Sequence, residues 1–176
     1  MSPRRRILAL TVILALTAGC AVRATHGGSG SRSPGLTIGS DLILVGKIPD
    51  GSGGDGVVPG SGPLMTQQVR KQLLAYHLKI LPSEAETAEA LFNEASAKRA
   101  TYVLVGRIPR WEDNATKWSK KLDYTSVALE LYRVSDHTLV ASSDRNVQGV
   151  TTPEDWADWV ADAAVSDLLG KPAPPW

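Results

Sequence analysis

Few side chains in the sequence have the types and spacing that catalysis requires. The three histidines, His26, His77 and His137, are far apart and show none of the spacings typical of zinc ligands. Glu112 and Asp113 are adjacent, so they cannot face each other across a glycosidic bond. Asp123 or Asp144 remains available as a second carboxylate, as one would in almost any chain of this length.

Two further catalytic patterns are missing from the sequence. No G-x-S-x-G elbow occurs, and the glycine-rich stretch 51–56 is not followed by the Lys-Ser/Thr pair of a phosphate-binding loop. The pattern therefore predicts no catalytic residue, no metal ligand and no cofactor, and indicates a protein that is not an enzyme.

One residue, Cys20, does have a predicted chemistry. It is the only cysteine, and it follows a positive start at residues 4–6 and an apolar run at residues 7–16. Such a run has the length of a signal-peptide core and is too short to span a bilayer. The residues Leu16-Thr17-Ala18-Gly19-Cys20 resemble the lipobox of bacterial lipoproteins, although the usual leucine stands one place early. We therefore expect cleavage after residue 19 and acylation of Cys20, with an ordinary secretory peptide as the alternative.

The mature chain is expected in the cell envelope, held on the periplasmic face by its acyl chains. Ala21 follows the cysteine, and the absence of aspartate there favours the outer membrane. Cleavage removes three of the 19 Lys and Arg and no acidic residue, which leaves 16 against 18 Asp and Glu and a net charge of −2. A chain without a basic excess is not expected to bind nucleic acid.

A tryptophan-containing segment is the most distinctive motif of the mature chain. It reads Trp111-Glu112-Asp113-Asn-Ala-Thr116-Lys-Trp118-Ser119 and is followed by Asp123. It resembles the W-E-D-x-A-T-x-W-S-G element of an uncharacterised family of small bacterial lipoproteins, with Lys120 where glycine is expected. The residues 153–156, Pro-Glu-Asp-Trp, are similar to a second element of that family, and the resemblance extends over roughly residues 40–170.

The strand and helix order is also similar, more distantly, to three kinds of envelope domain. These are the penicillin-binding-protein activator lipoproteins, the curli secretion channel and the N-terminal domain of the Tol translocation protein. The resemblance implies a binding or assembly module. From the residues, Trp111, Glu112, Asp113, Thr116 and Trp118 form a candidate binding surface, because exposed tryptophan beside charge is typical of contact sites. The alternative is that both rings pack over the sheet and the acidic residues cap turns.

Hydrophobic spacing predicts one α/β domain, α+β-like, over residues 41–170, with a mixed sheet in the order β-α-β-α-β-β-β-α. Strands are expected at 41–48, 78–81, 101–108, 124–134 and 138–147, and a long flexible loop at 49–62. Helices are expected from Pro63, from a capping box of Ser83 and Glu86, and from Thr152-Pro153 to Gly170. Residues 20–40 are expected to be a flexible tether and residues 171–176 an extended tail.

These expectations favour a non-catalytic, membrane-anchored adaptor that binds an envelope protein or peptidoglycan. The alternative is a small hydrolase or ligand carrier with a site under the loop between Trp111 and Trp118. A deep pocket with converging polar groups would favour the alternative, whereas a shallow surface would favour the adaptor.

Overall fold

The apolar run that begins at Leu42 forms an interior strand of the sheet, buried on both faces as its composition predicts. In the computed structural model, which describes residues 24–34, 38–39, 41–54, 56–85, 87–114 and 121–172, Ile43, Leu44 and Val45 are at most 1% exposed. Both faces of this strand are therefore buried, which a continuous branched run favours. The described elements, in chain order, are β1 (Thr25–Arg32), β2 (Leu42–Val45), β3 (Ser52–Gly53), β4 (Gly56–Val57), α2 (Ser61–Ala75), β5 (Lys79–Pro82), α3 (Ala88–Ala97), β6 (Tyr102–Arg107), β7 (Trp111–Glu112), β8 (Asp123–Arg133), β9 (Leu139–Gly149) and α5 (Pro153–Leu169).

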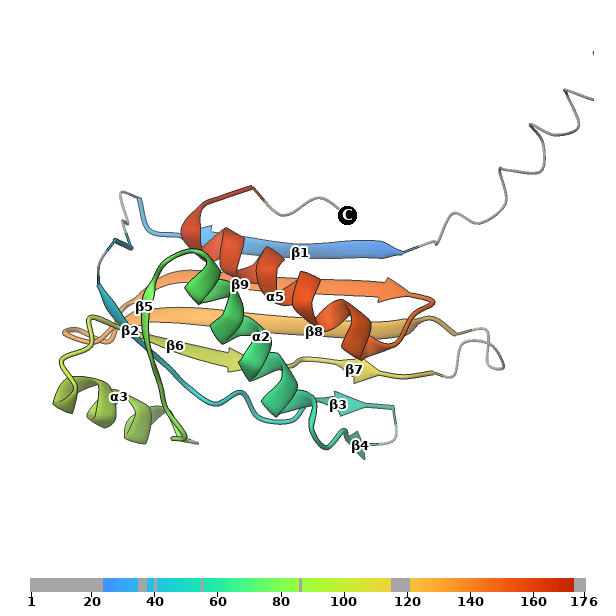
Figure 1. The fold of residues 1–176 in the computed structure, drawn as a ribbon, viewed down its shortest axis with the longest axis horizontal. Helices are drawn as coiled ribbons and strands as arrows, with labels where there is room; N and C mark the ends of the chain where they lie inside the picture. Colours follow the sequence, from blue (N-terminus) through green and yellow to red (C-terminus); the bar gives the residue numbers. More distant parts are fainter. Residues whose placement is uncertain are drawn as a thin grey trace, which may run out of the picture.

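The fold is a mixed sheet with helices, as the sequence predicts. In the described residues the sheet has seven strands, and the helices lie on both of its faces. The strand order is β1-β9-β8-β6-β2-β5, and β7 pairs with β8 beyond the end of β6. Strand β2 is parallel to both β5 and β6, whereas β6, β8, β9 and β1 pair antiparallel. The two early crossovers therefore produce the parallel half, and the late hairpin produces the antiparallel half (Figure 1).

Helices α2 and α5 lie side by side on one face of the sheet, and α3 lies on the other (Figure 1). The core beneath α2 and α5 contains Met65, Val69, Val160 and Ala164, all fully buried. A smaller cluster beneath α3 contains Leu91, Ala95, Leu44 and Val103 and packs on β2 and β6. Among the described residues, no helix is long and apolar enough to cross a membrane.

The N-terminal residues correct one prediction. Residues 25–32 were expected to belong to a flexible tether, yet they form β1, which pairs antiparallel with all of 141–148 of β9. Small residues make this pairing possible, because a Cβ at Gly28 would lie 2.0 Å from the carbonyl oxygen of Asp144 and one at Gly30 would lie 3.0 Å from Cβ of Asp167. The glycine and serine composition thus fits a strand lying close against β9 and α5. The expected acylation site, Cys20, and residues 1–19 lie outside the described residues.

Two helix starts also differ from the prediction. Helix α3 begins at Ala88, where the Thr87 side chain accepts a hydrogen bond from the backbone N–H of Ala90. Ser83 instead accepts from the N–H of Ala85 and donates to Glu94, so it does not cap the helix as expected. Helix α2 begins at Ser61, two residues before Pro63. Helix α5 begins and ends as predicted, with Thr152 before it and Gly170 at φ 65° after it.

Candidate functional site

Trp111 lies in the core of the molecule. It occupies β7 opposite Thr125 of β8, and its side chain is 1% exposed. The first residues of the glycine-rich loop lie against it, since a Cβ at Gly51 would be 3.4 Å from Cβ of Trp111 and 2.4 Å from Cγ2 of Ile108. A side chain buried in this way cannot contact a partner, so the assignment of Trp111 to a binding surface is wrong.

The glycine-rich loop and the tryptophan segment, far apart in the sequence, therefore form one packed unit. The loop also contains a short hairpin of β3 and β4, which replaces part of the long flexible loop expected there. A Cβ at Gly53 would lie 2.4 Å from the carbonyl oxygen of Trp111, so the loop backbone leaves no room between them. The described start of the tryptophan segment, Trp111 and Glu112, is thus packed directly against the glycine-rich loop.

The remaining polar residues of the segment stabilise the base of the loop that follows it. Asp123 is 3% exposed, and its carboxylate accepts a hydrogen bond of 2.6 Å from the backbone N–H of Asn114. The Asn114 side chain donates to the carbonyl oxygen of Leu122 at 2.7 Å. These contacts join the two ends of the loop, a structural role that the spacing from Trp111 to Asp123 did not reveal. Thr116 and Trp118 lie outside the described residues.

Glu112 is held in a two-bond contact with Arg110. The Nε and Nη2 atoms of Arg110 donate to the two carboxylate oxygens at 2.8 and 2.7 Å. These bonds, and weaker ones from Asn114, hold the pKa of Glu112 below its ordinary value. The Arg110 guanidinium also lies 4.5 Å from the centre of the Tyr124 ring. Because its pKa is lowered, Glu112 is ionised at neutral pH and unsuited to act as a general acid. The next residue, Asp113, is exposed.

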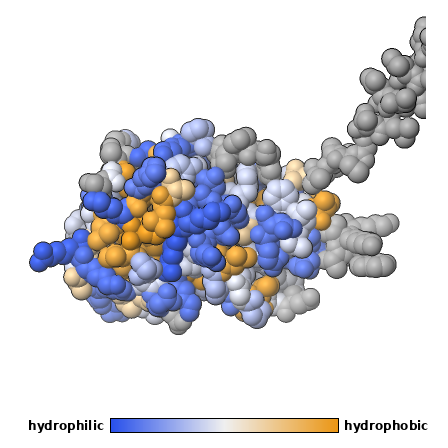
Figure 2. All heavy atoms as spheres, viewed as in Figure 1, coloured by the Kyte–Doolittle hydropathy of each residue, from blue (hydrophilic) through white to orange (hydrophobic). Residues whose placement is uncertain are grey.

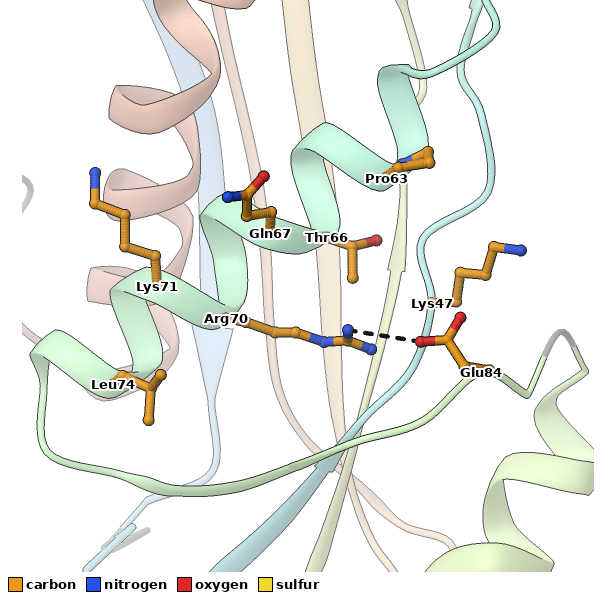
Figure 3. Close-up of a pocket in the computed structure, with 8 residues that line it drawn as sticks. All are labelled: Lys47, Pro63, Thr66, Gln67, Arg70, Lys71, Leu74 and Glu84. Carbon is orange, nitrogen blue, oxygen red and sulfur yellow. Dashed lines mark ion pairs between the residues drawn. The ribbon is translucent and has the colours of Figure 1, made fainter.

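A different surface of the molecule has the form of a binding site. It is a groove of about 450 Å³ between α2 and the segment that follows β5 (Figure 3). The carboxyl ends of β2 and β5 lie at this groove. From β2 the chain crosses to α2 on one face of the sheet, and from β5 it crosses to α3 on the other face. Ligands of open α/β sheets bind outside the carboxyl ends of strands where connections diverge in this way. The groove is lined by Lys47, Pro63, Thr66, Gln67, Arg70, Lys71, Leu74 and Glu84.

Arg70 holds the two walls of the groove together. Its Nη2 donates to the carbonyl oxygens of Ser83, the residue after β5, at 2.9 Å and of Val45, the last residue of β2, at 3.3 Å. Its Nη1 lies 3.8 Å from Glu84, toward which it points in Figure 3. The guanidinium thus satisfies two carbonyl groups at the strand ends and fixes the shape of the groove.

Two further polar side chains near the groove, Thr66 and Asp50, are also engaged by the backbone. The Thr66 hydroxyl donates to the carbonyl oxygen of Gly62 and accepts from the N–H of Ile48. Asp50 accepts from the N–H groups of Gly60 and Gly62 at 3.1 and 2.8 Å. A carboxylate of the chain therefore occupies the start of α2, where a helix N-terminus would otherwise favour a bound anion.

The groove has a partly apolar rim. Leu74 is 56% exposed, one of the most exposed large hydrophobic residues in the described part of the chain. Hydrophobic atoms gather beside α2 on this face, toward β5, within a largely hydrophilic surface (Figure 2). No sequence pattern indicates these residues, because Arg70, Leu74 and Glu84 form no local motif and only the order of strands in the sheet brings them together. Within the described residues, no cluster of three or more His, Cys, Asp or Glu side chains could hold a metal ion.

Comparison with known proteins identifies a family and a fold. Residues 37–172 match the family described as a domain of unknown function (DUF4823), nearly the stretch that the tryptophan element indicates. A dodecameric PelC variant from Paraburkholderia phytofirmans, which carries one leucine-to-methionine substitution, has a similar fold. Its TM-score is 0.64 at 20% identity, over 84% of this chain and 100% of that chain. A second PelC dodecamer structure from the same organism has a TM-score of 0.61 at 19% identity, over 81% of this chain and 96% of that chain.

A more distant likeness is to lipoprotein GNA1162 from Neisseria meningitidis. Its TM-score is 0.49 at 10% identity, over 62% of this chain and 83% of that chain. No curated protein sequence matches the chain. At their identities of 20% and 19%, the two PelC structures establish the fold alone.

Proposed function

Because the chain belongs to the DUF4823 family, described only as a domain of unknown function, we propose its role from the geometry: a non-catalytic adaptor of the cell envelope. It is anchored to the periplasmic face of the outer membrane through acyl chains on Cys20. The groove between α2 and the segment after β5 binds the partner. One observation carries this proposal: the groove is open and preformed, because Arg70, Thr66 and Asp50 fix the backbone around it.

The lining of the groove favours a protein segment as the partner. Leu74 and Pro63 contribute apolar surface to the groove. Lys47 contributes a positive charge, Glu84 a negative charge, and Gln67 an amide that can donate and accept hydrogen bonds. No aromatic side chain lines the groove in the described part of the chain, although sugars are commonly bound by stacking on aromatic rings. Peptidoglycan is therefore the less favoured partner. The PelC structures are dodecamers, which supports assembly as a use of this fold.

The anchor is tested by metabolic labelling with a fatty acid. Wild-type protein should incorporate the label, and Cys20→Ser should leave unlabelled precursor or soluble protein. Label retained on Cys20→Ser would contradict the lipoprotein assignment.

The groove is tested by photo-crosslinking in intact cells. A photoreactive amino acid at Gln67, exposed beside the groove, should trap a protein, whereas one at Glu89, exposed on α3, should not. Leu74→Asp should abolish the crosslink without lowering the thermal midpoint, because Leu74 is mostly exposed. Equal trapping from both positions, or trapping that survives Leu74→Asp, would contradict the groove as the binding site.

A further inference from the structure

One end of the sheet gathers the start of the described chain and several connections. The register pairs Thr25 of β1 with Gln148 of β9, Gln148 with Tyr124 of β8, and Tyr124 with Glu112 of β7. The chain therefore enters the domain at the same end as the β7–β8 loop and the connection from β9 to α5 (Figure 1). We call this end, defined by Thr25, Gln148 and Val150, the entry end.

The distance between the entry end and the expected acylation site is short. Ala24, the residue before β1, already packs against the core. Only four residue steps separate Cys20 from Ala24, and a fully extended chain covers at most about 3.6 Å per residue. Whatever conformation the intervening residues adopt, Cys20 lies within about 14 Å of the domain. An acylated Cys20 therefore keeps the entry end close to the membrane.

Exposed apolar side chains lie at this end. Val150, between β9 and α5, is 45% exposed, and Val57 of β4 is 69% exposed on the hairpin whose other strand contacts β7. Glu154 and Asp155 in the first turn of α5 are exposed nearby. Valines favour contact with lipid, whereas the two carboxylates oppose deep insertion and attraction to anionic lipid.

We infer that the domain rests on the membrane with its entry end, and that the contact is a shallow one with the headgroup surface of neutral lipids. This inference rests on the proposed acylation of Cys20. It also places the groove. Val45, which ends β2, aligns through Leu104 with Leu131, seven residues along β8 from Tyr124. At about 3.3 Å per residue, the end of β2 beside the groove lies on the order of 20 Å from the entry end. A partner in the groove is thus bound beside the membrane surface.

Two exposed positions on β9 and just after it provide a matched test. Val150 and Leu139 are 45% and 43% exposed and lie at opposite ends of β9. In full-length protein Cys20 is the only native cysteine, and acylation blocks its thiol. Val150→Cys and Leu139→Cys can therefore each be labelled with a fluorophore at a single site. The acylated proteins are then reconstituted in phosphatidylcholine vesicles that contain a nitroxide-headgroup lipid.

We expect several-fold stronger quenching of the fluorophore at position 150 than at position 139. Equal quenching, or stronger quenching at 139, in protein whose acylation is verified by mass spectrometry would overturn the orientation and leave the anchor intact. Protein that carries no acyl chain would overturn the proposed function, and the inference with it. Thermal melts of both variants should match the wild type, because neither side chain is buried.

Discussion

Strands β2 and β1 belong to one sheet but are held in it by different forces. In β2, the side chains of Ile43, Leu44 and Val45 are buried between layers of helix, so burial of apolar surface stabilises the strand. In β1, nearly every residue is exposed, and the strand is held by its backbone ladder to β9. The interior strand β2 is thus specified by its own side chains, and the edge strand β1 by its neighbours.

A few polar contacts add to the ladder of β1. The hydroxyls of Ser31 and Ser142 lie 2.8 Å apart, and Nη1 of Arg32 donates to the carbonyl oxygen of Leu169 at 3.1 Å. Below the strand, Arg145 of β9 forms a two-bond pair with Asp167 of α5, with both distances 2.6 Å. Strand β1 should therefore detach locally at a small cost, whereas loss of apolar packing in the interior should destabilise the whole domain.

The largest expected effect is that of removing a buried apolar side chain. Trp111→Ala should lower the free energy of unfolding by about 3–5 kcal/mol, because it leaves a large cavity under the glycine-rich loop. Trp118→Ala, which we expect to remove an exposed side chain, should cost less than about 1 kcal/mol. Denaturant melts measure both. Similar, large losses for the two variants would contradict the surface role that the sequence predicts for Trp118.

The polar support beneath β1 should contribute less. Arg145→Met should cost about 1.5–3 kcal/mol, because Asp167 then loses a charged donor in a mostly buried position. A double-mutant cycle with Asp167→Asn isolates the contribution of the pair. A coupling energy near zero would show that the pair only accompanies the packing of α5 on β9.

A backbone change in β1 sharpens the comparison further. Gly28 has a φ of +136°, and a Cβ there would collide with the backbone of Asp144, so Gly28→Ala should cost about 1–3 kcal/mol. At its neighbour Gly27, a Cβ would meet only the end of the Asn146 side chain, at 3.3 Å. Gly27→Ala should therefore cost no more than about 0.5 kcal/mol.

Amide exchange distinguishes a local effect from a global one. In Gly28→Ala, amides of residues 25–32 should lose protection while those of β2 keep it. Loss of protection in both strands together would mean that β1 is part of the cooperative core, contrary to the comparison.

The smallest effect concerns the pH dependence of the tryptophan segment. Arg110 holds the pKa of Glu112 below its ordinary value of 4.5, so the folded state binds this proton less tightly than the unfolded state. The stabilisation is present above pH 4.5 and is lost as the pH falls through the lowered pKa in the folded state. Glu112→Gln should remove this contribution, of less than about 1 kcal/mol for a partly exposed pair. Arg110→Met should remove the same contribution, and an unchanged acid slope in either variant would disprove it.

The parts of the fold that were predicted correctly share one physical property. Strands 42–45 and 102–107 are mostly buried apolar runs, and helix α5 buries side chains at helical spacing. Both patterns are visible in the residues themselves. The start of α3 was misplaced because Ser83 and Thr87 both have the chemistry of a cap. Only the packing of Leu91 and Ala95 on the sheet selects Thr87. For Trp111, composition could not distinguish a binding surface from a buried side chain, because its cover comes from residues 51–53.

By itself, the sequence determined the mixed sheet and the order of most of its elements, since hydrophobic period and cap residues act over a few neighbouring positions. It also carries the expected acylation signal at Cys20, a linear motif. Only the tertiary structure decided that residues 25–32 form a strand, that Trp111 lies in the core, and that Arg70 and Glu84 share a groove. Each of these depends on which distant backbone lies alongside, and that follows from the strand order in the sheet.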